Sequence, residues 1–331
     1  EEMSMPEIWH QKNFSIHDVL MRRSQLIHGK FNARIKNPLK EKNFIHLLQE
    51  LSMAHKTVST EVFLKKSPLA IFERNHLSPL LANPAPLQFA RLQENPTVLP
   101  HVDYLVGDTD AKVATSLTEL HTYAVPVSNI IKLLSAGLLG KQSARKLVPT
   151  RWSITAVDDT LSKNLLKKIR LYPELNDILL FHATYNGNHY EIALLPGVYS
   201  FEVIEAEIKS GSPKFWQDYE FFNGRKKYAD NVVGAYYANR LALCEYLEKI
   251  QRQATALFLR EIRPEYYAPL GVGILRECSR AAFTNGGEKC VSIDYAFTKM
   301  QERLRLPGNL FQEKSILLQN YGKQKKLGEW F

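Results

Sequence analysis

Residues 178–195 read ILLFHATYNGNHYEIALL, and this stretch decides the fold. Its two apolar halves flank Asn186-Gly187, the residue pair that most favours the type I′ turn of a two-residue β-hairpin. In the hairpin register, His182 lies opposite Glu191. We interpret this pair as a cross-strand salt bridge, with an acid–base pair as the alternative. The stretch therefore predicts an antiparallel hairpin and, with it, a sheet.

Segments on both sides of the hairpin extend this prediction. Residues 200–208 predict a third strand, and Arg151 to Val157 predicts a strand before the hairpin. Residues 231–262 are apolar over more than half of a helical circumference, which is typical of a helix in the core. Residues 67–101 contain six prolines and predict an irregular wrap. The expected fold is α+β, with a long central helix packed against a mixed or antiparallel sheet.

The pattern of elements also divides the chain into a body and a tail. Residues 1–306 are expected to form a globular body, which could consist of a subdomain, 1–140, and a core, 141–306. Pro307-Gly308 ends the last predicted helix. Residues 307–331 are therefore expected to form a flexible C-terminal tail.

The composition indicates a folded, basic protein. The 331 residues are 45% hydrophobic and 11% aromatic, so the chain can bury a substantial core. Lys and Arg number 43 against 34 Asp and Glu, which gives a formal net charge of +9. That excess favours anionic partners, and DNA is the natural candidate.

Particular residue types disfavour several other classes of protein. The three cysteines, Cys244, Cys278 and Cys290, form no CxxC pair, so we expect neither a disulfide framework nor a zinc site. Apolar runs do not approach the ~20 residues of a membrane helix. The acidic start Glu1-Glu2 is unlike a signal peptide. These features predict a cytoplasmic protein with no membrane partner.

The most unusual block is 145–159, RKLVPTRWSITAVDD. In a regular strand, Arg151, Ser153 and Thr155 would share one face. That face would offer a guanidinium group beside two hydroxyl groups, which suits a phosphate. These three residues are therefore candidate phosphate ligands.

Two carboxylates end the same block. Asp158 and Asp159 fall where the predicted strand gives way to a helix. Carboxylates at that position could bind Mg²⁺ or act as a catalytic base. Asp is also an ordinary helix cap, and capping with buried ion pairs is an equally good interpretation.

A second arginine cluster lies on the predicted helix 231–262 and after it. Arg252, Arg260 and Arg263 recur at spacings that can place them near one side of this helix. A charged stripe on an apolar helix either pairs with carboxylates or binds an anion. In the second case Arg252, Arg260 and Arg276 would be ligand-binding residues. The carboxylates available for pairing are Glu245, Glu248 and Glu261.

Residues 324–331 read QKKLGEWF and carry the clearest partner signal. In a single helical turn Leu327, Trp330 and Phe331 fall at i, i+3 and i+4 and share one face. Gln324 lies one turn earlier, with an amide that can donate and accept hydrogen bonds. The octet thus suits helix-in-groove recognition. The alternative is a segment folded back with its aromatic residues in the core.

Several blocks resemble one known family, the NreA-type archaeal DNA repair proteins. In chain order they are LLSAGLLG at 133–140, the 145–159 block, GAYYA at 234–238 with Arg240, RQA at 252–254, REI at 260–262, and PLGV at 269–272 with Arg276-Glu277. The octet 324–331 in turn resembles the motif by which replication and repair proteins dock on the sliding clamp PCNA. In that motif Gln324 would fill a polar pocket, and Leu327, Trp330 and Phe331 an apolar one.

The resemblance implies a DNA repair factor that binds the clamp through its C terminus. Many members begin with a cysteine zinc finger that has no counterpart here, and Gly273 stands where they often have Trp. We expect a body that binds nucleic acid or a phosphate-bearing ligand. One alternative is an enzyme acting on DNA or a nucleotide-like group, in which Arg151 holds a phosphate and Asp158 or Asp159 acts as base or metal ligand. Another is a non-enzymatic DNA-binding scaffold.

Overall fold

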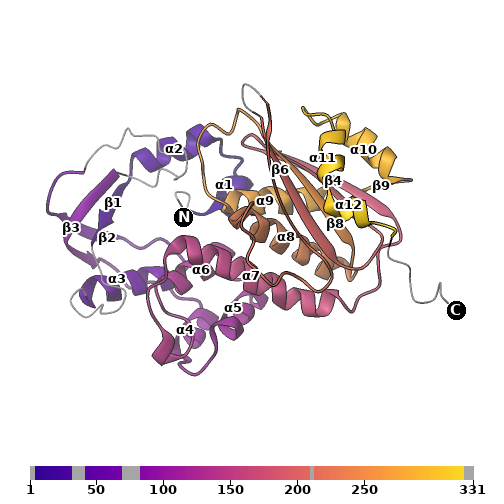
Figure 1. The fold of residues 1–331 in the computed structure, drawn as a ribbon. Coiled ribbons are helices and arrows are strands. Elements are labelled where there is room, and N and C mark those ends of the chain that lie inside the picture. The colour runs from indigo at the N-terminus through magenta and orange to yellow at the C-terminus, as the bar shows by residue number, and fades with distance from the viewer. Residues whose placement is uncertain (1–3, 32–41, 69–82, 209–211, 324–331) are drawn as a thin grey trace. The chain divides into compact units, whose positions relative to one another are not determined.

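The computed structural model describes residues 4–31, 42–68, 83–208 and 212–323 (Figure 1). The chain forms two compact units, each with its own sheet. Unit 1 comprises Glu1–Leu161 and Ala268–Gly273. Unit 2 comprises Ser162–Tyr267 and the chain from Ile274 onward.

Unit 1 contains a three-stranded sheet. In sheet order its strands are β1 (Ile27–Lys30), β3 (Asn83–Leu92) and β2 (Thr60–Leu64). β3 runs parallel to β1 and antiparallel to β2. Gly29 permits the close approach of β1 to β3, because a Cβ atom there would lie 2.7 Å from the Leu87 side chain.

Helices make up most of the rest of unit 1. Ser15 caps one of them through a capping box with Asp18, as the sequence pattern favours. α3 packs against β3 and against α6 (Figure 1). The helices of the described part are α1 (Pro6–Gln11), α2 (Ile16–Ser24), α3 (Lys42–Met53), α4 (Pro100–Gly107), α5 (Val113–Thr122), α6 (Val127–Ser135), the short η2 (Gln142–Ala144) and the start of α7 (Thr150–Ile169).

The Pro-rich stretch 67–101 is more regular than predicted, because it contains β3. Pro84 and Pro86 lie on this strand, two residues apart, so both face the same neighbouring edge. The Pro86 carbonyl accepts from the Lys65 N–H just beyond the end of β2. The positions where the two prolines lack an N–H therefore lie beyond the end of β2, and β3 tolerates prolines there.

Unit 2 contains a mixed six-stranded sheet. The predicted hairpin forms in the predicted register, with positive φ at both Asn186 and Gly187. β6 and β8 are parallel, and the other neighbouring strands are antiparallel. The sheet order is β7 (Lys214–Glu220), β6 (Ser200–Glu207), β8 (Thr255–Ile262), β5 (Asn188–Leu195), β4 (Ile178–Tyr185) and β9 (Glu288–Cys290).

Helices cover both faces of this sheet, which confirms the α+β class. Aromatic contacts hold α8 (Gly234–Ile250) on one face, where the Tyr236 ring lies 5.0 Å from that of Phe201. The other face packs an apolar cluster that includes Leu257, Met300 and Phe311. The remaining helices are α9 (Gly273–Ala282), η3 (Phe283–Asn285), α10 (Ile293–Gln301), α11 (Asn309–Lys314) and α12 (Ile316–Asn320).

The helix predicted over 231–262 is wrong in its second half. α8 ends at Ile250, and Gln251 adopts the left-handed conformation (φ 51°) that stops a helix. Residues 255–262 instead form β8, the strand between β6 and β5. A strand buried on both faces reads as a continuous apolar run, which periodicity alone cannot distinguish from a buried helix.

The strand predicted from Arg151 to Val157 is also wrong. These residues belong to α7, the 20-residue helix that starts at Thr150. Ser153, Val157 and Leu161 are all fully buried, and their spacing of four residues is that of a helix face. Several β-branched residues at the start of α7 favour a strand locally, but tertiary packing prevails.

The C-terminal segment is folded for part of its length. α11 and α12 lie within 307–331, and Phe311 is fully buried in the apolar cluster of unit 2. Glu202 of β6 accepts hydrogen bonds from the backbone N–H groups of Ile316 and Leu317. The expected tail is shorter by these residues, and the octet 324–331 lies outside the described residues.

Candidate nucleic-acid interface

One long segment of unit 1 carries positive charge without any acid. Between Glu119 and Asp158 the sequence contains no Asp or Glu. Five basic residues lie in this interval: Lys132, Lys141, Arg145, Lys146 and Arg151. The segment forms the end of α5, α6, η2 and the start of α7. Any anion that reaches it meets no carboxylate from the same stretch of chain.

Glycine and backbone contacts fold this segment back on itself. Gly137 has φ +71°, and a Cβ atom there would lie 2.7 Å from the Lys146 carbonyl group. The Val148 N–H donates to the Ser135 carbonyl at 3.0 Å. The Arg145 guanidinium donates to backbone carbonyls of Val106, Asp108 and Gly140 at 2.8 Å each. Residues 145–150 are thereby held against the end of α6.

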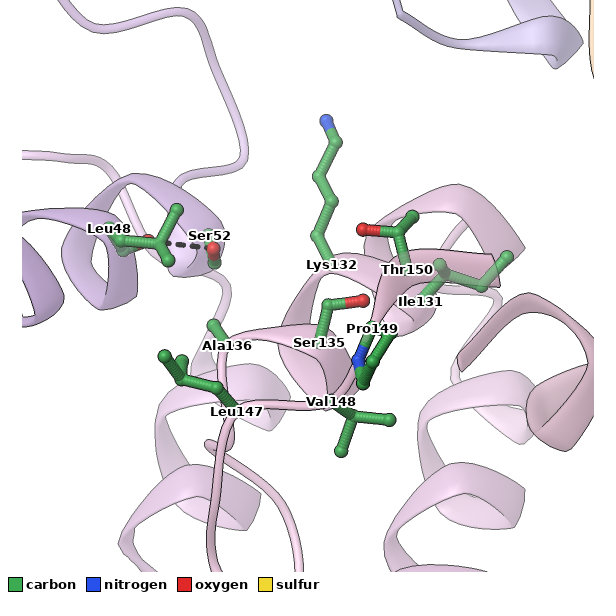
Figure 2. A pocket seen from close by; sticks show the side chains of 10 residues that line it. All are labelled: Leu48, Ser52, Ile131, Lys132, Ser135, Ala136, Leu147, Val148, Pro149 and Thr150. Carbon is green, nitrogen blue, oxygen red and sulfur yellow. Dashed lines mark hydrogen bonds between the residues drawn. The ribbon is translucent and has the colours of Figure 1, made fainter. Parts of the chain in front are cut away.

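A cavity of about 400 Å³ lies at this junction (Figure 2). α3 contributes Leu48 and Ser52, α6 contributes Lys132 and Ser135, and Thr150 marks the start of α7. Apolar side chains form much of the wall, and the extended Lys132 side chain is its one basic group (Figure 2). The other lining residues are Ile131, Ala136, Leu147, Val148 and Pro149.

The Ser135 hydroxyl group is an unusual part of this wall. Its oxygen is buried and has no hydrogen-bond partner within the part of the chain that the structure describes. Leaving a buried hydroxyl group unpaired costs about 1–3 kcal/mol. A polar group of a ligand in the cavity would remove that cost. The Ser135 and Thr150 hydroxyl groups together with Lys132 form a donor set suited to a phosphate.

The first turn of α7 presents exposed side chains beside the cavity. Arg151 is exposed, and Trp152 is 61% exposed, which is unusual for the largest apolar side chain. The N–H groups of Trp152 and Ser153 both donate to the Pro149 carbonyl. An exposed guanidinium and an exposed indole at a helix N-terminus are the groups that contact phosphates and stack on bases.

The predicted phosphate set at 151–155 is only partly assembled. Arg151 and Thr155 share a helix face, and the Thr155 hydroxyl donates to the Arg151 carbonyl at 3.2 Å. Ser153 is fully buried on another face, so the prediction that all three share one face is wrong. Side chains two residues apart lie on the same face of a strand but are separated by about 200° of rotation in a helix.

The two carboxylates at the end of the block lie inside α7. Asp158 is fully buried and Asp159 is half-buried, and neither caps a helix. Neither Asp158 nor Arg151 lines the cavity at the start of α7. Across residues 4–31, 42–68, 83–208 and 212–323, no group of three or more His, Cys, Asp or Glu side chains is placed to hold a metal ion.

The predicted arginine stripe does not form, because its members lie on different elements. Arg260 is on β8, buried, and ion-paired with Glu205 while it also donates to the Asn188 side chain. Burial lowers the pKa of Arg260, but the negative charge of Glu205 outweighs this effect and holds the pKa above its ordinary value. Arg252 follows α8 and donates to the Gln251 carbonyl.

The remaining members of this cluster are also built into unit 2. Arg276 is 1% exposed on α9, with its Nε atom 3.5 Å from a carboxylate oxygen of Glu277. Of the carboxylates considered as partners, Glu261 does pair with a member of the stripe, Arg263, whereas Glu245 pairs with Arg280 and Glu248 with Lys168. These arginines therefore act in the packing of unit 2.

The cross-strand pair His182–Glu191 has the predicted register but not the predicted contact. The buried Glu191 carboxylate binds His189 Nε2 at 3.0 Å and the Arg303 guanidinium at 2.7 and 2.9 Å. His189 lies two residues from Glu191 on β5 and so shares its face. Burial, and then the charge of Arg303, lower the pKa of His182. Period-2 spacing along β5 was the signal that could have found this partner.

Comparison with known families covers nearly the whole chain. Residues 1–212 match the family model described as "Archaeal Nre, N-terminal", and residues 220–330 match "Archaeal Nre, C-terminal". The chain belongs to the archaeal Nre family. In this Nre protein the cavity at the start of α7 lies wholly within the N-terminal family region.

Curated relatives of this Nre protein are named as DNA repair proteins. DNA repair protein NreA of Archaeoglobus fulgidus is 34% identical over 296 residues, which cover 88% of this chain and 75% of the relative. DNA repair protein NreB of the same organism is 34% identical over 331 residues, which cover 98% of this chain and 82% of the relative. DNA repair protein NreA of Haloferax volcanii is 32% identical over 286 residues, which cover 83% of this chain and 68% of the relative. No solved structure matches.

Both family regions contribute strands to the six-stranded sheet of this Nre protein. The N-terminal family region supplies β4, β5 and β6, and the C-terminal region supplies β8 and β9 of the same sheet. Among the described helices, none is long and apolar enough to cross a membrane.

Proposed function

We propose that this Nre protein is a DNA repair factor that the sliding clamp PCNA recruits through residues 324–331. The body of the protein then binds nucleic acid, with the acid-free segment around the start of α7 as its phosphate-binding surface. The protein works in the cytoplasm, where an archaeal cell keeps its DNA.

The recruitment proposal rests on the positions of four particular residues within the octet 324–331. Gln324, Leu327, Trp330 and Phe331 occupy every position of a clamp-docking motif, and one helical turn places the three apolar side chains on one face. Three residues before the motif, the Tyr321 hydroxyl donates to the Pro196 carbonyl at 2.7 Å, which ties the chain to unit 2. A clamp that encircles DNA would raise the local concentration of the attached body.

The test of recruitment is a double substitution, Trp330→Ala with Phe331→Ala. We expect the affinity for purified archaeal PCNA, measured by surface plasmon resonance, to fall by roughly 100-fold or more, because two anchor side chains of the interface are lost. Gly328→Ala, at a position between the anchors, is the matched control. The thermal midpoint of the double variant should equal that of the wild type.

A different result would assign the octet to the core. If the double variant melts several degrees below the wild type, Trp330 and Phe331 are packed inside the protein. Retained clamp binding by the double variant would contradict the proposal directly.

The acid-free segment carries the proposal for the body. Lys132 lines the cavity, Arg151 and Trp152 are exposed beside it, and no acid lies between residues 119 and 158. Phosphate contacts make DNA affinity depend on salt, with a slope of about 0.7–0.9 for each phosphate neutralised. A variant with both Lys132→Gln and Arg151→Gln should therefore lose more than one unit of that slope.

The matched control for this measurement is Arg252→Gln. Arg252 is partly exposed like its counterparts but follows α8 in unit 2. Its replacement should leave both the affinity and the salt slope unchanged. Equal slopes for the wild type and the Lys132/Arg151 variant would show that nucleic acid binds elsewhere or not at all.

A further inference from the structure

Two half-exposed phenylalanine rings lie side by side on the sheet of unit 1. Phe63 of β2 and Phe89 of β3 are directly opposite in the strand register. Their ring centroids are 5.9 Å apart, and the residues are 49% and 48% exposed. Paired aromatic side chains at this exposure leave substantial apolar surface in water, which ordinary packing does not explain.

The sheet holds both rings in fixed positions. β3 bulges between Leu87 and Phe89, since Leu64 pairs with Leu87 and Phe63 with Phe89, so the buried Ala85 and Leu87 do not share the side of Phe89 by simple alternation. Beyond the bulge, Phe89 and Arg91 are exposed whereas Ala90 and Leu92 are half-buried, so the ring pair lies on the open side of the sheet. Unlike side chains on a mobile loop, Phe63 and Phe89 would lose little conformational entropy on binding a ligand.

Basic side chains surround this aromatic pair. Lys65 and Lys66 directly follow β2, and both are exposed. Arg91 stands two residues beyond Phe89 on the same side of β3, with 61% of its side chain exposed, and its partner is Glu61. Two acids, Glu61 and Glu94, stand against these three bases along β2 and β3, so the net charge beside the pair is positive. This positive charge is complementary to a phosphate backbone. A purely apolar partner would gain nothing from it.

We infer that Phe63 and Phe89 form a stacking platform for single-stranded nucleic acid. The inference rests on the proposed function and names the form of nucleic acid that the body takes. Aromatic side chains stack on bases whose faces are free, which a duplex does not offer. Lys65, Lys66 and Arg91 would contact the phosphates between the stacked bases.

α3 connects the platform to the surface already described. It packs against β3 and against α6, and its residues Leu48 and Ser52 line the cavity at the start of α7 (Figure 1). The exposed Trp152 and the Phe63–Phe89 pair thus belong to one compact unit. A strand held by stacking at the platform could extend toward the basic segment without leaving unit 1.

The experiment measures binding of a fluorescein-labelled oligothymidylate of roughly 16 nucleotides to the full chain by fluorescence anisotropy. A duplex of equal length is measured in parallel. The variant carries Phe63→Leu and Phe89→Leu, which keep apolar side chains in the strands. Tyr104→Leu on α4 is the matched control, because Tyr104 is 65% exposed without belonging to the platform.

We expect the double variant to bind the single strand at least fivefold more weakly, since each stacked base contributes about 1–3 kcal/mol. Duplex binding, the thermal midpoint and the Tyr104→Leu control should match the wild type. Wild-type affinity of the double variant for the single strand would overturn the platform and leave the proposed function standing. The apolar pair would then belong to a protein contact.

Two other outcomes also decide the question. An equal loss for single strand and duplex would overturn the selectivity for single strands, and with it the platform. If the wild-type protein binds neither oligonucleotide, the platform and the nucleic-acid part of the proposed function both fail, while clamp binding is judged by its own measurement.

Discussion

Arginines serve opposite purposes in the two units. In unit 2, Arg240, Arg260 and Arg303 are ion-paired with buried glutamates. In the acid-free segment of unit 1, Arg145 binds backbone carbonyls and Arg151 is exposed. The density of arginine in the sequence is therefore a poor guide to an anion site. A better guide to an anion site is a segment whose arginines have no carboxylates nearby to neutralise their charge.

The largest expected effect comes from breaking a pair in unit 2. Arg260→Gln leaves the buried Glu205 carboxylate without its cation, and such a loss costs about 3–5 kcal/mol. Urea unfolding should show this as a lower midpoint with an unchanged slope. Arg151→Gln in unit 1 is the control and should change stability by no more than about 0.5 kcal/mol. A stable Arg260→Gln protein that has lost DNA affinity would instead make Arg260 a ligand residue, and the contrast between the units would fail.

An intermediate effect is expected from Glu202, a buried carboxylate that accepts hydrogen bonds from the uncharged groups of Gln217, Ser315 and the start of α12. Burial raises the pKa of Glu202 from 4.5, although hydrogen bonds from Ser315 and from the start of α12 oppose the rise. The unfolded state therefore ionises first as the pH rises. The free energy of unfolding should therefore fall as the pH climbs from about 4.5 through the raised pKa.

Glu202→Gln removes this titration. Urea unfolding of the variant and the wild type between about pH 4 and pH 7 should show the variant gaining stability relative to the wild type as the pH rises. Parallel curves would mean that the ionised Glu202 carboxylate is as well solvated in the folded protein as in the unfolded chain.

The smallest effect is expected at an exposed pair in unit 2. Arg305 and Glu265 form an ion pair whose side chains are 46% and 53% exposed. Arg305→Gln should cost about 0–1 kcal/mol, and high salt should remove most of that difference. A loss as large as that of Arg260→Gln would show that burial does not separate structural from surface arginines in this protein.

Local chemistry explains which parts of the fold could be predicted from the sequence. Asn186-Gly187 requires positive φ at two consecutive residues, and few other turns suit that pair, so the hairpin and its register follow. Ser15 and Asp18 mark a helix start by a different local device, the reciprocal hydrogen bonds of a capping box. Residues 255–262 carry no such signal, because a strand buried on both faces shows no apolar–polar alternation, and Ala256 to Leu259 are a continuous apolar run. Their place as a strand depends on neighbours far away in the chain.

The phosphate-binding role of the candidate site stays a prediction, while the structure shows where its residues lie. Arg151 is exposed at the edge of the cavity region, as a phosphate ligand requires. Ser153 and Asp158 are buried, because α7 replaces the predicted strand and turns these side chains inward. Lys132 and Ser135 were not singled out, since they come next to Thr150 only through the turn at Gly137. The interval without Asp or Glu between residues 119 and 158 is the sequence signal that could have found them.

The order of strands in unit 2 bears on how this family can change over generations. β8, from the C-terminal family region, is inserted between β5 and β6, both from the N-terminal region. Neither region supplies a continuous part of this six-stranded sheet, so a gene broken between residues 212 and 220 would encode two halves that must intercalate to complete it. Swapping one region between distant relatives would require compatible hydrogen-bonded edges on both sides of β8. Co-expression of the two halves, followed by a test for a folded complex, would measure how strictly the strands depend on one another.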